Sequence, residues 1–458
     1  MKKIFKVINI FLLVLIMAVS VVGCGRGGSG GGRDGKTTIT FMHIWPEHAK
    51  KVNEIVTDFM SENEDIIVSP TYVPYTEIDR TLQSAFYGGE MPDVFFQWTH
   101  YMYKWVPDDI PMDLTFLYDE LKSDYLQDGV AWEAGKINGK YYNAPFRSTG
   151  FLVAYNKTIF ENQGWKVPET LQDFENVMKD AKKDFATPFA LYGGNGGTLT
   201  QINTAFGIFR DIMAGAVEDP NYRTGRLRPN MEDDSSARLI EKLKNWMDLG
   251  YFGSGAMGRK REDVMNLFMN GQTPMCLFNN NEMGTLSEGM INDMEIGVFA
   301  FPAPAGVDFK YVFGGFDGFC ISSTTKHKEA AVKFLKYLLS VDVQQSWANT
   351  EKSIMVNKNV KYEEESQHKI AEEMLYAGKY DQYADYNGGQ YLERNATLLN
   401  DFLSGSYNKG ADQLIKDMIN NTYTGMKDPL LNPPNGLDWI DPVYVPKEYD
   451  RSWIVSDK

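Results

Sequence analysis

Three apolar strands separated by two amphipathic helices open the body of this chain, and this alternation restricts the fold more than any other feature. Residues 37–44 (TTITFMHI), 65–73 (DIIVSPTYV) and 92–96 (PDVFF) are rich in β-branched and aromatic residues, as strands are. Residues 49–63 and 76–87 instead place apolar side chains three and four apart, which is typical of one helix face. Strand–helix–strand units of this length predict a parallel sheet with right-handed crossovers, and therefore an α/β fold.

A second alternation of strands and helices follows a long extended stretch, YYNAPFRSTGFLVAY, at residues 141–155. Because 458 residues are too many for one compact core, two lobes are expected. The C-terminal part is predicted to be helical to about Thr422 and to end in a tail rich in proline and tryptophan. The remaining expected elements are a helix capped by Thr170 with Leu171, Phe174, Val177 and Met178 on its inner face, helices at 238–249 and 322–339, and strands within 188–194, 273–282, 296–306 and 311–322.

The N-terminus has the pattern of an export signal. Three lysines precede the apolar run VINIFLLVLIMAVSVV at residues 7–22, which is short for a membrane span of about 20 residues. The run ends in Val-Val-Gly-Cys, which resembles the lipobox of bacterial lipoproteins, whose cysteine is acylated and becomes the first mature residue. We therefore expect a signal peptide at 1–23, lipidation of Cys24 and a glycine-rich tether at 24–36; an uncleaved anchor helix is the alternative.

Composition and motifs argue against several function classes. A formal charge of −15 argues against nucleic acid and anionic lipid as ligands. The five histidines show no metal-binding spacing, and the sequence lacks a serine nucleophile elbow and a phosphate-binding loop. No metal, cofactor or catalytic residue is therefore expected. Cys276 and Cys320 lie in apolar runs and are expected as buried thiols, although a disulfide between them stays possible.

Several short motifs occur in one order along the chain behind the lipobox. In sequence they are GGEMPDVFF, INGKYYNAPF, AYNKTIF, GQTPM, FGGFDGFCIS and KEAAVKFLKYL, between residues 88 and 338. Together they resemble the extracellular solute-binding protein family 1, the carbohydrate receptors of bacterial ABC importers. The resemblance runs from about residue 37 to residue 358, with a weaker continuation to Thr422.

The resemblance implies a two-lobe, periplasmic-binding-protein-like fold of type II, with strands that cross between the lobes near residues 146–150, 314–318 and 353–357. The small residues RSTG and GGFDG interrupt apolar strands at the first two positions, as a hinge or a β-bulge would. The expected N-lobe combines residues 37–146 and 316–353. The expected C-lobe combines 147–315 and 354–458, and the ligand is expected in the cleft between the lobes.

A sugar site needs aromatic platforms and planar hydrogen-bonding groups. After its GQTPM strand the family often has a tryptophan, but this chain has Asn279-Asn280-Asn281, which favours hydrogen bonding on that side and puts a plain maltodextrin-type site in doubt. Loops expected to face the cleft supply the ligand-binding candidates Trp45, Glu47, Gln97, Trp98, His100, Arg147, Asn195, Asn281, Glu282, Phe316, Asp317 and Tyr386, with Asn280, Gln201 and Gln390 as further candidates.

The resemblance implies a sugar-binding lipoprotein, monomeric and without a cofactor, on the outer face of the cytoplasmic membrane. Its partners would be a mono- or oligosaccharide and the transmembrane subunits of an ABC permease, with membrane contact through the lipid alone. Two alternatives remain open from the sequence. One is an extracellular carbohydrate-active enzyme, and the other is a receptor of the same fold that serves a sensor kinase or binds a non-sugar ligand.

The lipobox generates a direct prediction. Cys24→Ala removes the thiol that would carry the lipid, so the protein should be released into the medium or stay as an uncut precursor. Membrane fractionation with immunoblotting measures both the location and the size of the product. A mature variant that stays bound to the membrane would contradict the predicted anchor.

Overall fold

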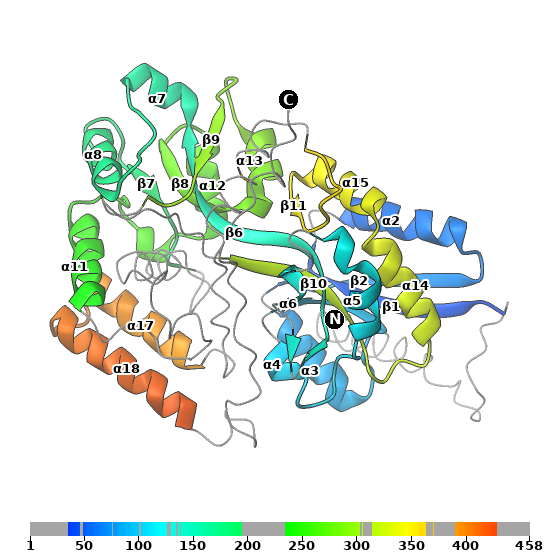
Figure 1. Cartoon of the computed structure of the whole chain (residues 1–458). Coiled ribbons are helices and arrows are strands. Elements are labelled where there is room, and N and C mark those ends of the chain that lie inside the picture. Colours follow the sequence, from blue (N-terminus) through cyan, green and yellow to red (C-terminus); the bar gives the residue numbers. More distant parts are fainter. Residues whose placement is uncertain are drawn as a thin grey trace, which may run out of the picture.

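The computed structural model describes residues 35–45, 49–75, 77–99, 102–125, 130–133, 136–137, 139–194, 234–302, 305, 314–362, 370 and 390–427. Figure 1 shows these residues arranged as two groups of helices and strands, joined by the long strand β6, Ala144–Asn156, which runs from one group to the other. We call the group that contains the N-terminal strands the first lobe and the other group the second lobe.

The first-lobe sheet is parallel at its start. β1 (Thr37–His43) lies between β2 (Ile66–Tyr72) and β3 (Val94–Trp98) and pairs in parallel with both. The strand–helix alternation of the sequence therefore predicted this part correctly. β10, Gly314–Ile321, then lies antiparallel between β3 and β6 and connects the N-terminal strands to the crossing strand.

The second-lobe strands use the other half of β6. β8 (Met275–Asn279) and β9 (Ile296–Phe299) are both antiparallel to β6, and β7 (Phe189–Ala190) is parallel to β8. The short strand β11, Ile354–Met355, pairs with the first half of β6, and β4 (Lys136–Ile137) pairs with β5 (Lys140–Tyr141) in a separate ribbon. β6 is thus the one described strand that belongs to both parts of the sheet.

Helices cover the sheet in both lobes, as Figure 1 shows. Those of the first lobe are α2 (Ala49–Glu62), α3 (Ile78–Gly88), α4 (Met102–Trp105), α5 (Thr115–Leu121), η2 (Lys122–Asp124), α6 (Val130–Glu133), α14 (Lys328–Leu338) and α15 (Val341–Glu351). Those of the second lobe are α7 (Lys157–Gln163), α8 (Leu171–Ala181), α11 (Asp234–Asp248), η5 (Ala256–Gly258), α12 (Arg261–Met269), η6 (Asn280–Glu282), α13 (Met283–Gly289), α17 (Gln390–Ser404) and α18 (Ala411–Lys427).

Two helix starts show how local chemistry sets the boundaries. α8 begins after Thr170 with the expected capping box, in which Thr170 and Asp173 bond each other's backbone N–H. α14, expected from residue 322, begins instead at Lys328. Ser322 forms an isolated bridge with Pro111, and its backbone N–H donates to Asp93 O at 3.0 Å, so this segment stays bound to the sheet edge and the helix starts later.

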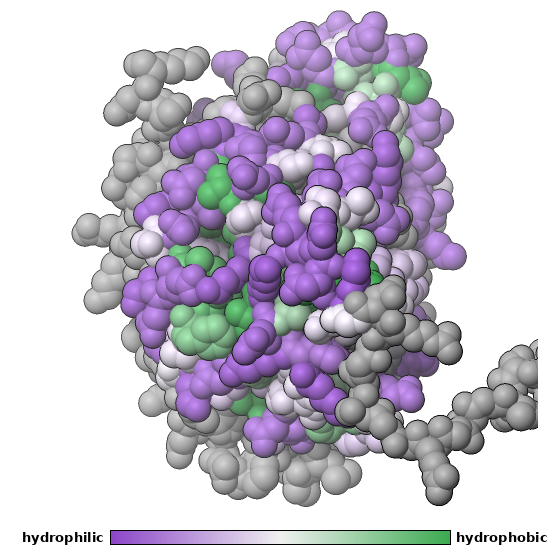
Figure 2. Space-filling model, turned by 90° about the vertical axis from the view of Figure 1, so that its right-hand side faces the viewer, coloured by the Kyte–Doolittle hydropathy of each residue, from purple (hydrophilic) through white to green (hydrophobic). Residues whose placement is uncertain are grey.

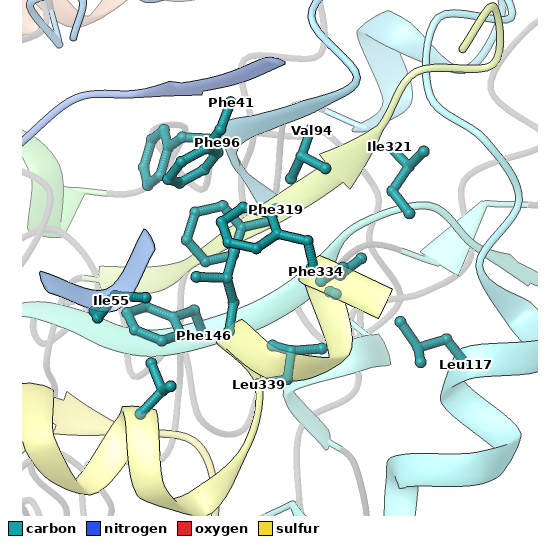
Figure 3. Close-up of a cluster of buried hydrophobic side chains, with 14 of the residues drawn as sticks. Phe41, Ile55, Val94, Phe96, Leu117, Phe146, Phe319, Ile321, Phe334 and Leu339 are labelled. Carbon is teal, nitrogen blue, oxygen red and sulfur yellow. The ribbon is translucent and has the colours of Figure 1, made fainter. Parts of the chain in front are cut away.

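The buried hydrophobic residues form separate cores in the two lobes. The largest first-lobe cluster packs aromatic rings from β1, β3, β10, β6 and α14 against one another, as Figure 3 shows for Phe41, Phe96, Phe319, Phe146 and Phe334. The second-lobe clusters are built mainly from residues 152–301; α17 and α18 complete one of them, and Ile354 and Ile370 join the other. Both lobes therefore have the interior that an independently packed unit requires.

The surface that Figure 2 shows, on the side of α2 and α14, is mainly hydrophilic, with small and separate hydrophobic areas. Among the residues that the structure describes, no helix is both long and apolar enough to cross a membrane. The N-terminal apolar run at 7–22 and residues 24–34 of the expected tether lie outside the described residues.

Gly318 gives a stability prediction. It lies at the irregularity between β10 and β6, where an added Cβ would overlap Asn143 Oδ1 and the backbone oxygen of Ala144. Gly318→Ala should therefore lower the free energy of unfolding by about 1–3 kcal/mol. Gly88→Ala, at the end of α3 in open space, is the matched control and should leave it nearly unchanged. Chemical denaturation measures both, and equal stability of the two variants would contradict the close approach.

Candidate ligand-binding site

The three segments expected to cross between the lobes lie side by side. Residues 314–317 of β10 pair with residues 147–150 of β6, and β11 pairs with Arg147 and Ser148. On its other side, β10 pairs with β3, where Asp317 lies opposite Trp98. The carboxyl end of β3 and both small-residue stretches, RSTG and GGFDG, therefore meet at one place.

A buried ion pair joins two of these segments. Arg147 Nε donates to Asp317 Oδ2 at 2.7 Å, and both side chains are less than a tenth exposed. The Arg147 guanidinium also lies 5.2 Å from the centre of the Trp45 ring, within the range of a cation–π interaction. Burial raises the pKa of Asp317, and the nearby Arg147 opposes that rise only in part.

Trp98 lies partly exposed at the end of β3, between two hydrophobic clusters. Its ring meets that of Phe96 edge-on, with 5.3 Å between centroids. The neighbouring Gln97 is fully buried; its Oε1 accepts from the Trp98 N–H at 2.9 Å, and its Nε2 has no hydrogen-bond partner. Phe316 is also buried, and its backbone oxygen accepts from Thr99 Oγ1 at 2.8 Å.

Trp45 lies in the hydrophobic core in this structure, with only 3% of its surface exposed. Its ring lies 4.7 Å from that of Trp347 and also contacts Phe96 and Phe319, which belong to the same core cluster. Sequence placed it in a loop after the first strand, where it could equally reach a ligand or turn inward. The structure gives it the inward position, and a direct ligand contact of Trp45 stays a prediction.

The asparagine run after β8 is used for hydrogen bonds within the protein. Asn280 is fully buried and bonds the backbone of β6. Glu282, only 6% exposed, accepts from Asn279 N at 3.0 Å and forms an ion pair with Arg261. The backbone N–H of Asn281 donates to Asn279 Oδ1 at 3.1 Å, while its own Oδ1 is buried without a partner.

Some predicted residues lie outside what the structure describes. These are Glu47, His100, Asn195, Gln201 and Tyr386. Gln390 begins α17. The structure thus gathers Trp98, Arg147, Phe316 and Asp317 at the crossing of the strands, and Asn281 and Glu282 beside it at the end of β8.

Sequence reasoning missed two polar residues on the second-lobe side. Tyr192 follows β7 and lies near enough to Glu282 and Arg261 for their charges to affect its pKa, which burial raises strongly. Ligands gather at the carboxyl ends of parallel strands, and that rule would have selected Tyr192. Arg261 starts α12, and no sequence pattern distinguishes it from other helix-starting residues.

The described residues contain no group of histidine, cysteine and acidic side chains that could hold a metal ion. Cys276 and Cys320 are free and buried in β8 and β10, which confirms the expected thiols and excludes the disulfide in this structure. Burial raises the pKa of Cys320 to about 12, so its thiol stays protonated at neutral pH.

Comparison with known proteins identifies the family. A model described as bacterial extracellular solute-binding protein matches residues 54–373, well over half of the chain. Among curated relatives, the multiple sugar-binding protein of Streptococcus mutans is 26% identical over 371 residues, covering 80% of this chain and 86% of the relative. A maltooligosaccharide ABC transporter solute-binding lipoprotein of Streptococcus pneumoniae is 26% identical over 215 residues, covering 45% and 47%.

Solved structures of sugar-binding proteins have the same fold. RafE of Streptococcus pneumoniae in complex with raffinose superimposes with a TM-score of 0.68 at 23% identity, covering 85% of this chain and 100% of that one. Maltose-bound MalE3 of T. maritima gives 0.72 at 17% identity, covering 85% and 99%. These likenesses establish the fold, and they confirm the expected α/β architecture of periplasmic binding proteins.

His43, beside Trp45 at the end of β1, generates a pH prediction. Burial lowers its pKa to about 4 in the folded protein, from a usual value of about 6.5. The unfolded chain therefore binds the proton more tightly, so the contribution of neutral His43 is complete above pH 6.5 and is lost as pH falls toward 4. We expect a loss of at most about 1.4 kcal/mol per pH unit in this window.

The measurement compares urea unfolding of the wild type with that of His43→Asn from pH 7 to pH 4.5. The asparagine oxygen can accept from the Trp45 N–H, as His43 Nδ1 does at 3.3 Å, but asparagine does not titrate. The variant should lose less stability than the wild type as the pH falls. Parallel profiles of the two proteins would show that His43 is not the titrating group.

Proposed function

Because the chain belongs to the bacterial extracellular solute-binding protein family, we propose that it captures a sugar or oligosaccharide outside the cytoplasm and delivers it to an ABC importer. The observation that supports this most is the similarity to a multiple sugar-binding protein along 80% of the chain. The members of this family are transporter binding proteins without catalytic activity, so the alternative of a carbohydrate-active enzyme is wrong.

The proposed ligand position is the space between the lobes next to the crossing strands. We propose Trp98 as the first-lobe platform, because the residue is partly exposed and its ring is supported edge-on by Phe96. A flat aromatic face suits the C–H surface of a sugar ring. Asp317 remains a proposed acceptor for ligand hydroxyls, with its carboxylate already oriented by Arg147.

On the second-lobe side we propose recognition by hydrogen bonds. Asn281 and Glu282 start the 3-10 turn after β8, and the unpartnered Oδ1 of Asn281 is an acceptor that a ligand hydroxyl could satisfy. A buried acceptor without a partner costs about 1–3 kcal/mol, so pairing it with a ligand adds to affinity. A family platform of tryptophan at this position is absent from the sequence. The remaining members of the proposed set are Trp45, Glu47, Gln97, His100, Arg147, Asn195, Phe316 and Tyr386.

The wider setting of this function is also proposed. The N-lobe of residues 37–146 and 316–353 and the C-lobe of residues 147–315 and 354–458 would close on the ligand, with residues 1–23 removed and Cys24 lipidated. The protein would then stand as a monomer on the outer face of the cytoplasmic membrane, held by its lipid. Its macromolecular partner would be the transmembrane part of an ABC permease. One of the relatives is itself a solute-binding lipoprotein, which supports this arrangement.

The experiment begins with a thermal-shift screen of mono- and oligosaccharides on the purified mature protein. A ligand that binds only the folded state raises stability by about 2.7 kcal/mol at a hundredfold excess over Kd. Chromatography of the sugar after long incubation should recover it unchanged. A complete absence of stabilising saccharides, with binding of a non-sugar solute instead, would overturn the proposed substrate class.

Trp98→Ala tests the proposed platform. Truncation of an aromatic anchor typically costs about 2 kcal/mol or more in binding, so the Kd for the sugar found in the screen should rise roughly thirtyfold. Isothermal titration calorimetry measures the change. Phe116→Ala is the control, because Phe116 is 43% exposed on α5 of the first lobe and packs under Lys328. Equal affinities of wild type and Trp98→Ala would exclude Trp98 from the site.

A further inference from the structure

The strand β6 changes partners in the middle of the RSTG stretch. It pairs with β8 only from Phe151, which lies opposite Asn279, toward its C-terminal end. Extending this register by one step places Asn280 opposite Gly150, but the chain turns there into the 3-10 turn η6. Toward its N-terminal end β6 pairs with β11, which reaches no further than Ser148. Neither β8 nor β11 therefore pairs with Thr149 and Gly150 of β6.

The side chain of Asn280 takes the place of the missing strand. Its Oδ1 accepts from the Gly150 N–H at 2.7 Å, and its Nδ2 donates to the Ser148 oxygen at 3.0 Å. One amide thus satisfies a backbone donor and a backbone acceptor two residues apart, as a neighbouring strand would. Asn280 is fully buried, so water cannot substitute for either bond.

The second lobe holds this amide firmly. Asn279 caps η6 and its Nδ2 donates to Thr149 Oγ1 at 2.9 Å, so two successive asparagines bind three successive residues of β6. Glu282 closes the capping box by accepting from the Asn279 N–H, and it is in turn paired with Arg261 at the start of α12. The segment 148–150 is thereby connected to β8, η6 and α12.

The first lobe holds the residues immediately before. Tyr125 OH donates to the Pro145 oxygen at 3.0 Å, and Val356 N donates to the Phe146 oxygen. Arg147 is held by its ion pair with Asp317, which lies opposite Trp98 of β3. β10 also pairs with residues 147–150, and β11 pairs with Arg147 and Ser148, so residues 148–150 are bonded both to these strands and to the asparagine run of the second lobe.

We propose that Asn280 is the positioning residue that holds residues 148–150 of β6 to the second lobe and thereby limits how far β6 bends along the RSTG stretch when the lobes move apart. This inference rests on the proposed function only in taking the lobes to open and close. Without the amide, the Gly150 N–H and the Ser148 oxygen would lose these two bonds, so β6 would bend more easily along the RSTG stretch and the ligand-free protein would sample a wider range of lobe arrangements. Asn280 then sets the geometry in which the two halves of the site face each other.

Amide hydrogen exchange on the ligand-free, mature protein tests the clamp. In Asn280→Ala the Gly150 amide should exchange at least tenfold faster, while the amides of residues 152–155 change only by the factor that global stability sets. Asn63→Ala is the matched control. Asn63 is also buried and bonds one backbone oxygen, that of Phe59 at 2.7 Å, but it lies at the end of α2. It should lower global stability without a selective effect at Gly150.

Small-angle scattering of the same proteins tests the effect on the lobes. Asn280→Ala should show a larger radius of gyration than the wild type and Asn63→Ala. A curve that superimposes on that of the wild type, or a Gly150 amide that changes no more than residues 152–155, would overturn the proposal. If Asn280→Ala does not fold, Asn280→Ser shortens the side chain and serves for both measurements. Neither measurement uses a sugar, so failure here is distinct from failure of the saccharide screen.

Discussion

The organisation of this protein depends on β6, whose backbone must stay hydrogen-bonded along its whole length although its neighbouring strands differ between its two halves. β6 has 13 residues and serves the first-lobe sheet with one half and the second-lobe sheet with the other. Buried backbone groups without partners are costly, so the strand cannot simply be bare where the sheets separate. The protein meets this requirement with amide and hydroxyl side chains. Asn280 bonds β6 itself, and Thr99 and Asn143 bond the neighbouring backbone of β10 and β3. Side chains thus supply hydrogen bonds to the backbone where the regular sheets end.

The buried pair of Arg147 and Asp317 has a different part in this arrangement. A buried ion pair contributes little net stability compared with apolar residues, but loss of one partner costs about 3–5 kcal/mol because the other charge stays buried. Its effect is therefore on specificity of structure. The pair lies next to the register shift between Asp317 and Gly318, where β6 and β10 could otherwise slip by one residue. A one-residue slip would separate the two charges, so the pair favours the observed register.

The parts of the fold that follow periodic patterns were predictable, and the parts set by long-range contacts were not. The alternation through residue 96 determined β1, α2, β2, α3 and β3, because each element shows its own period within a few residues. The later start of α14 depends on the bond between Ser322 and Asp93, which are far apart in sequence. The same limit applies to the site. The sequence predicted that the asparagine run faces the ligand, but the partner of Asn280 is the β6 backbone, which no local pattern can reveal.

Trp45 and Trp98 show how the same residue type takes two roles at one sheet edge. They occupy equivalent places, three residues beyond the register pair of Met42 and Phe95 on adjacent parallel strands. Trp45 packs against Trp347 from α15 and against the Arg147 guanidinium, so its ring is part of the first-lobe core. Trp98 packs against two hydrophobic clusters and keeps part of its surface exposed. Because the rings of Trp45 and Trp98 both pack edge-on against that of Phe96, the exposed ring rests on a fixed support. A ligand that stacks on Trp98 therefore has little ordering of the protein to overcome, which is how a preorganised surface gains affinity.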